Sequence, residues 1–342
     1  MLGLNKSYSC VHVLGAGTDW SPGWDAYFLI RTLEKLKMCV STKRLAYRQV
    51  VYLSDKYVAK RSNYYLFGNR VLFDYFHGDP NISPEFKWLF EGIVRKRENI
   101  SGIRVSHSGI ESLFLDRGFE GKVFRIPIGV ELDWFKLQTE DSKKAVRDEL
   151  GIPQSAVVIG SFQKDGNGWG VGLTPKMIKG PDIFLETIHC LKSLIPELFV
   201  LLTGPARGYV IQGLNKLGVP FLHTYLNEYS EVPKLYHALD VYIVSSREEG
   251  GPKAVLESMA SGIPLVTTRV GQAIDLVQHG RNGWITDIGD IDALAHWTVH
   301  AVQNRASVTS VLMRARNTAK ENSNDAQINL WREFLDQFLH SS

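Results

Sequence analysis

Two carboxylates eight positions apart are the residues of this chain whose type and spacing best suit chemistry. Glu249 follows a short apolar segment, Val241–Val244, and Glu257 lies further along the same stretch. Between them, Pro252 favours the first position of a helix, where its missing N–H is no loss. Glu257 would then lie one turn beyond Lys253, and both side chains can face the mouth of a sheet. The N-terminus of such a helix offers N–H donors and a positive dipole end to phosphate.

The elements that must position these residues alternate between strand and helix, which predicts parallel sheets with helices on both faces. In the first half we expect strands at Cys10–Leu14, Val50–Leu53, Val71–Phe76, Ile103–His107 and Val123–Pro127, and helices at Asp25–Leu36, Pro84–Arg97 and Gly109–Arg117. A polar stretch, Gln138 to Lys144, marks the boundary between the halves. In the second half we expect strands at Ala156–Ser161, Leu198–Thr203, Val241–Val244 and Ile263–Thr268, and helices at Pro181–Leu194, Pro252–Ala260, Ile291–Gln303 and Ala326–Leu339.

Length and composition favour a globular protein of two domains. The 342 residues suffice for two cores, and the apolar content of 44% and charged content of 22% are those of soluble proteins. No apolar run approaches ~20 residues, and the first ten residues lack a secretion signal. The three cysteines, Cys10, Cys39 and Cys190, form no C-x-x-C pair, which favours buried thiols in a reducing cytosol.

The charges are divided unevenly along the chain. Residues 1–125 hold 19 Lys and Arg against 12 Asp and Glu, a balance of +7, whereas residues 126–342 hold 20 against 24, a balance of −4. A basic first half predicts an anionic partner, such as a membrane surface, a lipid phosphate or an acidic glycan. The alternative is a solvated basic surface.

The stretch from Glu249 to Pro264 reads E-G-G-P-K-A-V-L-E-S-M-A-S-G-I-P and resembles the E-x7-E signature of retaining glycosyltransferases of family 4, also described as glycosyl transferases group 1. Other segments resemble further elements of that family in the same order. They are Val105-Ser106 with residues 126–135, Lys179-Gly180, the G-P turn of residues 201–205, and the run from Val270 to Gly283.

The resemblance implies the GT-B fold, an α/β architecture of two facing Rossmann-like domains with parallel sheets. We expect an acceptor-side domain at 1–137, a nucleotide-sugar-binding domain at 138–323, and a crossover helix within 324–342 that packs back on the first domain. Ligands of open α/β sheets bind outside the carboxyl ends of strands. Four candidate residues follow predicted strands and would line the cleft between the domains: Glu249, Lys164, Gly204 and His77.

The activity implied by the resemblance is transfer of a hexose from a nucleoside-diphosphate sugar to an acceptor hydroxyl, with retention of configuration. Negative charge grows on the departing diphosphate, so fixed cations are the main electrostatic requirement. Lys179 and Lys164 are the candidates. The family's arginine after the strand glycine is missing, because this chain reads Gly160-Ser161-Phe162, and Lys164 is the proposed substitute.

The resemblance also assigns the contacts of the donor. Glu249 would hold hydroxyls of the donor sugar and Glu257 those of the ribose, since an ionised carboxylate can accept two hydrogen bonds from a vicinal diol. The alternative for each is an acid that stabilises a helix N-terminus. Glycines would let the backbone approach the donor; they are Gly17, Gly204, Gly250 and Gly251.

In the first domain, the loop after the first strand contains Gly17 and Trp20, and Trp20 is a candidate for acceptor binding. The G-x-G of this loop is not completed to the dinucleotide fingerprint. His77 follows a predicted strand and would contact the donor sugar, although a lone histidine is more often structural. Asp79 would orient the acceptor.

Two further segments allow two interpretations each. Residues 165–175 form a glycine-rich insertion, either an ordinary surface loop or a mobile one in which Trp169 covers the donor. Apolar residues from Phe86 to Val94 follow helical spacing before the basic run Arg95-Lys96-Arg97. A core-facing helix with a basic end is favoured there over a membrane-surface helix.

The partners expected are a nucleotide-sugar donor and a glycan, lipid-linked or polysaccharide-precursor acceptor, without nucleic acid. Contact with an anionic membrane is a further interpretation, for a cytoplasmic protein at the inner membrane face. No D-x-D or His/Cys cluster suggests a metal, and no cofactor beyond the donor is expected. The alternatives are another GT-B enzyme, such as a sugar-nucleotide epimerase, and a non-catalytic nucleotide-sugar-binding protein. The nucleotide, the sugar and the acceptor are not identified by the sequence.

Overall fold

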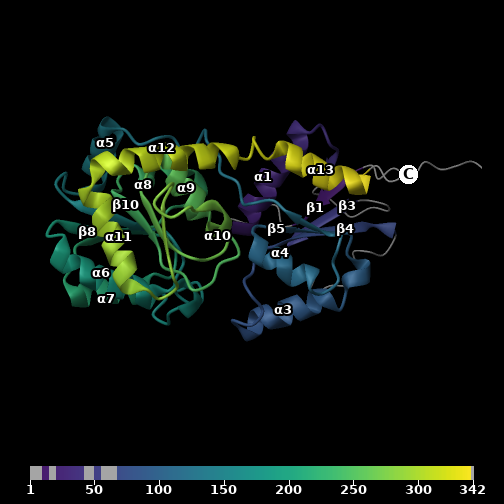
Figure 1. Cartoon of the computed structure of the whole chain (residues 1–342), viewed down its shortest axis with the longest axis horizontal. Helices are drawn as coiled ribbons and strands as arrows, with labels where there is room; N and C mark the ends of the chain where they lie inside the picture. Colours follow the sequence, from purple (N-terminus) through teal and green to yellow (C-terminus); the bar gives the residue numbers. More distant parts are fainter. Residues whose placement is uncertain (1–9, 15–20, 42–49, 55–67, 340–342) are drawn as a thin grey trace, which may run out of the picture. The chain divides into compact units, whose positions relative to one another are not determined.

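The computed structural model describes residues 10–14, 21–41, 50–54 and 68–339, and it divides into two compact units (Figure 1). The first unit comprises Met1–Ile128 and Asn324–Ser342, and the second comprises Gly129–Ser323. The division at 128 precedes the expected boundary at 137. The reason is packing: Val130 pairs with Ser323, and the buried ring of Phe135 lies 5.7 Å from that of Tyr236.

The first unit is built on a parallel sheet of six strands in the order β2-β1-β3-β4-β5-β6. The strands are β1 (Val11–Val13), β2 (Val40–Ser41), β3 (Val50–Ser54), β4 (Arg70–Tyr75), β5 (Gly102–Val105) and β6 (Val123–Arg125). Side chains alternate between the two faces of the sheet, as the period of a strand requires. Val50 and Tyr52 of β3 therefore enter one core, whereas Val51 enters the other.

Helices cover both faces of this sheet. One face packs against α1 (Ser21–Lys35) and α13 (Ile328–Leu339), and the other packs against α3 (Pro84–Val94) and α4 (Ser108–Leu115). In α13, Trp331, Phe334, Leu335 and Phe338 form a buried stripe at helical spacing. The predicted return of the C-terminal helix to the first unit is thus confirmed (Figure 1).

Helix α3 settles one of the open interpretations of the sequence. Its Phe86, Leu89, Phe90 and Ile93 are buried in the core of the first unit. The core-facing interpretation of this helix is therefore confirmed. The helix begins after Ser83, whose Oγ accepts the amide N–H of Phe86 at 3.1 Å. It ends at Val94, earlier than predicted, and a turn leads from there into a 3-10 helix at Arg97–Asn99.

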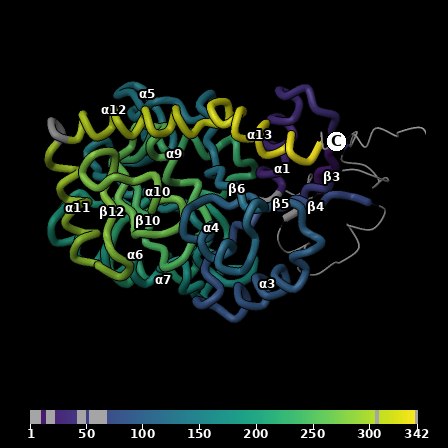
Figure 2. Tube along the Cα trace, turned by 45° about the vertical axis from the view of Figure 1, so that its right-hand side comes forward, coloured from purple at the N-terminus to yellow at the C-terminus, as the bar shows by residue number. Residues whose placement is uncertain are grey.

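The second unit holds another parallel sheet of six strands, in the order β12-β11-β10-β7-β8-β9. The strands are β7 (Val157–Ser161), β8 (Leu198–Thr203), β9 (Phe221–Thr224), β10 (Val241–Val244), β11 (Leu265–Thr268) and β12 (Trp284–Thr286). One face packs against α6 (Pro181–Leu194), α7 (Gly208–Leu217) and α11 (Ile291–Gln303). In both views α6 and α7 lie side by side (Figures 1 and 2).

The opposite face of this sheet packs against α5 (Glu140–Leu150), α8 (Val232–Tyr236), α9 (Lys253–Ser261) and α12 (Arg305–Glu321). A short helix, α10 (Ala273–Leu276), follows β11. The polar stretch Gln138 to Lys144, expected to mark the boundary between the halves, contains the start of α5. Thr139 and Ser142 form a capping box there, which satisfies the first amides of the helix.

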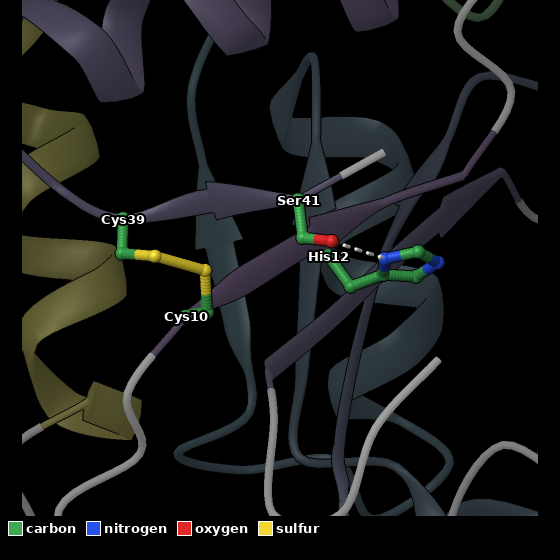
Figure 3. The surroundings of a disulfide bond; sticks show 4 residues. All are labelled: Cys10, His12, Cys39 and Ser41. Carbon is green, nitrogen blue, oxygen red and sulfur yellow. Dashed lines mark hydrogen bonds between the residues drawn. A yellow bond between two sulfur atoms is a disulfide. The ribbon is translucent and has the colours of Figure 1, made fainter. Parts of the chain in front are cut away.

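The expectation of three free thiols is wrong, because Cys10 and Cys39 form a disulfide (Figure 3). Strands β1 and β2 are parallel with Val11 opposite Val40, so the residues before them lie opposite each other, with Cα atoms 4.6 Å apart. Cys190 is free. Disulfides are rare in the cytosol, so the cysteines no longer support a reducing compartment.

Among the residues that the structure describes, no helix combines the length and the apolar character that crossing a membrane would need.

Candidate functional site

The candidate site lies at the carboxyl edge of the second unit's sheet. Because all six strands are parallel, the residues that follow β7, β8, β10 and β11 meet at this one edge. The segments concerned are 162–164, 204–208, 245–252 and 269–272. They contain most of the residues singled out by the sequence motif.

Glu249 and Lys179, two residues predicted for the site, form an ion pair at this edge, although they are 70 positions apart in the sequence. The other oxygen of Glu249 accepts a hydrogen bond from the hydroxyl of Ser246 at 2.8 Å. The side chains of Lys179 and Glu249 are only 21% and 9% exposed, so both charges are held in a partly dehydrated environment. Electrostatic interactions are stronger there than in bulk water.

Gly180 explains why Lys179 can reach Glu249. This glycine has a φ of 61°, and a Cβ at this position would lie 1.9 Å from the carbonyl oxygen of Ser245. The backbone amides of Arg247 and Glu248 both donate to the carbonyl of Ile178, at 2.8 and 3.0 Å. A side chain at 180 would push these two segments apart, so the K-G pair is a geometric requirement of the site.

Gln163 joins the end of β7 to the same cluster. Its Nε2 donates to the carbonyl of Lys179 at 2.8 Å, and its Oε1 lies 3.2 Å from the hydroxyl of Ser246. Ser246 and Gln163 are residues that the sequence analysis missed. The doublet Ser245-Ser246 before the first motif carboxylate was the available signal for Ser246, and none pointed to Gln163.

Glu257 is buried and held by two tyrosines. The hydroxyl of Tyr236 donates to one carboxylate oxygen at 2.8 Å, and that of Tyr229 donates to the other. Burial raises the pKa of Glu257, whereas the two phenols and the charge of Lys253 lower it. The ammonium of Lys253 lies 5.2 Å from the centre of the Tyr229 ring. A ligand hydroxyl that reached Glu257 would join or displace these phenols.

Pro252 is the residue before α9, not its first helical residue as expected. Its ψ of 110° is extended, and the helix begins at Lys253. Gly271, with a φ of 49°, lies against this turn, since a Cβ there would be 2.8 Å from Pro252 Cδ and 2.9 Å from the Glu249 carbonyl oxygen. The Val270-Gly271 pair therefore lets the loop after β11 pack on the Glu249 turn.

Among the predicted donor-binding glycines, Gly204 has a φ of 94°, in the region that favours glycine. Its carbonyl lies 2.8 Å from Nε2 of His223. Gly250 and Gly251 are not among the described residues with positive φ. The predicted role of these two glycines in donor binding stays a prediction.

Lys164 lies against Trp169. Its ammonium is 3.7 Å from the centre of the Trp169 ring, and burial lowers its pKa. No ion pair joins Lys164 to Glu249 in the described part of the chain. Ser161, at the position after the strand glycine, is buried and bonded to Arg207. The role of Lys164 as a substitute for the family's arginine stays a prediction.

The sequence analysis also missed a buried ion pair near the carboxyl edge of the second unit's sheet. Arg207 lies 3.0 Å from a carboxylate oxygen of Asp165 and donates to the carbonyls of Ser161 and Thr203 at 2.6 and 3.0 Å. Burial raises the pKa of Asp165, and the positive charge of Arg207 opposes that shift. The pair fixes the ends of β7 and β8 relative to each other.

In the first unit, His77 follows β4 as predicted, with its ring 5.4 Å from that of Phe86 and 6.2 Å from that of Tyr75. Asp79 uses one oxygen to accept the backbone and side-chain amides of Asn81 at 2.8 and 2.9 Å, so it stabilises a turn. Gly17 and Trp20 lie outside the described residues. The roles of all four stay predictions.

A buried polar cluster of the first unit was not expected. The hydroxyl of Tyr52 donates to Asp74 at 2.5 Å, and Arg104 lies 3.2 Å from the same carboxylate. Arg104 also donates to the carbonyls of Ile126 and Pro127 at 3.0 and 2.8 Å. Burial raises the pKa of Asp74 to about 6, against the opposing charge of Arg104. The cluster ties β3, β4 and β5 to the segment that leads out of the unit.

Over the described residues, no group of three or more His, Cys, Asp or Glu side chains is arranged to hold a metal ion.

The comparison with protein families matches residues 171–304 to glycosyl transferases group 1, which confirms the resemblance drawn from the motifs. The lipopolysaccharide core biosynthesis mannosyltransferase LpsB of Rhizobium meliloti is 24% identical over 204 residues, 56% of this chain and 55% of that protein. The UDP-Gal:alpha-D-GlcNAc-diphosphoundecaprenol alpha-1,3-galactosyltransferase of Escherichia coli is 25% identical over 205 residues, 57% of this chain and 48% of that protein. The chain spans about half the length of these curated relatives.

Among solved structures, HepE of Anabaena in complex with UDP and glucose superposes with a TM-score of 0.73 and 18% identity, over 95% of this chain and 98% of that one. This likeness extends over both units and shows the fold, which is the GT-B architecture expected from the motifs.

Proposed function

We propose that this chain, a relative of glycosyl transferases group 1 with the GT-B fold, is a retaining hexosyltransferase that uses a nucleoside-diphosphate sugar. The observation that supports it most is the Lys179–Glu249 pair at the carboxyl edge of the second sheet, beside the N-terminus of α9. This arrangement offers a cation for a diphosphate and a carboxylate for sugar hydroxyls within a few ångströms of each other.

The proposed reaction breaks the bond between the anomeric carbon of the hexose and the outer phosphate oxygen. A bond forms from the acceptor oxygen to the same carbon on the same face, and the acceptor proton passes to the departing phosphate. No protein nucleophile is required. The chain's task is to stabilise the negative charge that develops on the diphosphate.

Lys179 is the residue proposed to meet that charge. Its ammonium is partly buried, so its interaction with a diphosphate would be stronger than in water. The donor would replace one carboxylate oxygen of Glu249 as the partner of Lys179. Glu249, still held by Ser246, would then be oriented to accept hydroxyls of the hexose.

The N-terminus of α9 and Glu257 are proposed to hold the rest of the nucleotide. The N-terminus of this helix follows Pro252 and carries the positive end of the helix dipole, which suits an anion. Glu257 lies one turn further along and would accept the ribose hydroxyls, with Tyr229 and Tyr236 fixing its orientation.

A second function is favoured by one observation. The position directly after the β7 glycine holds Ser161, which is buried and bonded to Arg207, and not a cation aimed at the edge. A chain with one phosphate cation fewer could bind a nucleotide sugar without transferring it. Donor binding with no turnover in the presence of acceptors would support this non-catalytic alternative.

The acceptor proposed is a glycan or a lipid-linked sugar. The E. coli relative acts on a diphosphoundecaprenol-linked sugar, as its name states, and HepE was solved with UDP and glucose. The balance of +7 over residues 1–125 suits an acceptor that carries phosphate. Peripheral contact with an anionic membrane is part of this proposal.

The test is a transfer assay with a panel of UDP-, GDP-, ADP- and dTDP-hexoses, with the anomeric configuration of the product read by NMR. Glu249→Ala should lower kcat/KM, and the decrease should correspond to a loss of roughly 2–4 kcal/mol of transition-state stabilisation, as expected for the loss of a key polar contact. The matched control is Glu186→Ala, an exposed carboxylate on α6. Turnover of Glu249→Ala equal to that of the control would remove the site assignment.

The same assay tests metal independence. We expect full activity in EDTA, because Lys179 and the α9 N-terminus supply the positive charge. Loss of transfer on chelation, restored by Mg²⁺ or Mn²⁺, would contradict this part of the proposal.

A further inference from the structure

The glycine-rich insertion forms a hairpin at the edge of the second unit; we call residues 164–177 the tryptophan hairpin. Gly166 and Pro175 form an antiparallel bridge, and the amide of Asn167 donates to the carbonyl of Thr174 at 2.9 Å. At the base, the amide of Lys176 donates to the carbonyl of Asp165 at 2.7 Å. The segment therefore has defined internal pairing.

The hairpin is also fixed to the turn after β8. The amides of Gly208 and Tyr209 donate to the carbonyls of Val171 and Gly172, at 2.7 and 3.0 Å. A Cβ at Gly166 or Gly172 would lie 2.3 Å from the carbonyl oxygen of Ala206. The glycines thus face the protein and allow backbone to pack on backbone, which is a close contact that no other residue permits.

The apolar side chains of the hairpin face outward. Trp169 is 64% exposed, Val171 71%, Leu173 53% and Met177 46%. Nowhere else in the described residues does a stretch of similar length expose as many large apolar side chains. Amphipathic segments normally bury apolar residues and expose small or polar ones, so the reversed arrangement marks an interaction surface.

The charges at the hairpin favour an anionic partner. Lys164 and Lys176 lie on either side of Trp169, Val171 and Leu173 in sequence, and the nearby Asp165 is buried in an ion pair with Arg207. Lys164 lies over the ring of Trp169, as a cation and an aromatic do at a membrane interface. A second copy of the chain fits less well, because a two-fold contact would bring lysines of both copies together.

We propose that the tryptophan hairpin binds an anionic lipid surface, with Trp169, Val171 and Leu173 entering the interface and the two lysines contacting head groups. Apolar side chains that enter the acyl boundary, together with lysines at the head groups, are the combination that holds peripheral proteins on anionic bilayers.

The position of the hairpin gives this contact a consequence for the proposed transferase. Its second arm leads directly into Met177–Lys179, so the membrane-binding residues and the donor cation belong to one continuous segment of the second unit. A lipid-linked acceptor would be concentrated beside the donor edge. The lipid contact itself does not depend on the proposed function, because it can be measured without donor or acceptor.

The experiment is flotation of the full chain with two kinds of vesicle. One contains only neutral phosphatidylcholine, and the other also contains about a third of phosphatidylglycerol, which makes its surface anionic. We expect binding to the anionic vesicles that weakens with salt. The variant Trp169→Ser/Val171→Ser/Leu173→Ser should lose at least roughly ten-fold in apparent partition, because each removed side chain loses apolar burial. The matched control, Met313→Ser on α12, removes a side chain of equal exposure and should bind as the wild type does.

Two readouts separate this result from misfolding and from other partners. The triple variant should keep the wild-type melting temperature, because its changed side chains are exposed. In a second measurement, brominated lipid should quench the tryptophan emission of Trp169→Phe less than that of the wild type. Equal binding of the triple variant and the wild type, or no binding by either, would overturn the proposal. A change of sedimentation coefficient in the triple variant without lipid would overturn it in favour of a contact between copies.

Discussion

Lys179 and Glu249 show how much of a site can depend on two side chains and the glycine beside them. The motif predicted both residues, because their types and spacing match a known signature. It could not predict Gln163, because the contact of Gln163 with Ser246 joins residues 83 positions apart, whereas Ser246 lies only three residues before Glu249. Residues that bind a ligand leave a pattern in the sequence, whereas residues that orient them are chosen by the geometry of one fold.

Lys179→Ala should weaken binding of the bare nucleoside diphosphate as well as slow transfer, because the ammonium is proposed to contact the diphosphate itself. A charge-assisted hydrogen bond is worth roughly 1.5–3 kcal/mol, so we expect at least a ten-fold rise in the Kd measured by calorimetry. Lys216→Ala, an exposed lysine on α7, is the control. Unchanged diphosphate affinity in Lys179→Ala would place the phosphate site elsewhere.

Asp74 makes the stability of the first unit depend on pH. The pKa of Asp74 in the folded state is about 6, above the 3.8 of an unperturbed carboxyl. Between these two pH values the folded protein therefore holds a proton on Asp74 that the unfolded chain has released. Stability from this group is present at low pH and decreases as pH rises towards 6. Lowering the pH from 7 to 5 should therefore stabilise the wild type by about 1 kcal/mol relative to Asp74→Asn.

The measurement for Asp74 is urea unfolding of both proteins at the two pH values, followed by a probe of the first unit. Other carboxyls titrate in both proteins and cancel in the difference. If the unfolding free energies of the wild type and Asp74→Asn changed by the same amount between the two pH values, the Asp74 carboxyl would ionise normally in the folded protein.

At the scale of secondary structure, the sequence predicted the elements with long, uninterrupted apolar patterns. The ranges of α6, β8, β10 and α11 are those expected. Helix α12 was missed because its buried stripe is made of small residues, Val308, Val311, Ala315 and Ala319, which pack closely but leave little hydrophobic signal. Strand β2 has two residues and is defined only by its pairing with β1, which no local pattern reveals.

The Cys10–Cys39 disulfide is the covalent link between those two strands, and its reduction tests their contribution to stability. Closing a loop between cysteines 29 positions apart restricts the unfolded chain, which corresponds to roughly 3–4 kcal/mol in the loop-entropy description. We expect reductant to lower the unfolding free energy of the wild type by about this amount. The variant Cys10→Ala/Cys39→Ala should be insensitive to reductant, and equal sensitivity of both proteins would contradict the link.

At the scale of the whole molecule, the alternation of strands and helices predicted two parallel sheets, and the family motifs predicted the GT-B fold. The division between the units was placed nine residues late, because residues 129–137 have no regular structure yet pack in the second core. Sequence patterns identify elements, but a boundary is decided by which core an irregular segment joins.

The first unit needs the end of the chain. A protein that stops at Ser323 would lack α13, whose Trp331, Phe334 and Leu335 complete one of its two cores. We expect this truncation to abolish the cooperative unfolding transition of the first unit and to leave that of the second, which scanning calorimetry would resolve. A first unit that unfolded cooperatively without α13 would show that the helix is an addition to its core.

The discontinuous first unit also sets an order for folding during synthesis. Domains usually fold as they leave the ribosome, beginning at the N-terminus. Here, residues 129–323 form a continuous unit that is synthesised entirely before α13. The sheet face that receives α13 must wait, with its apolar strand residues uncovered, until the helix emerges. During that interval one core of the first unit is incomplete, which is the stage at which a chaperone would bind the chain.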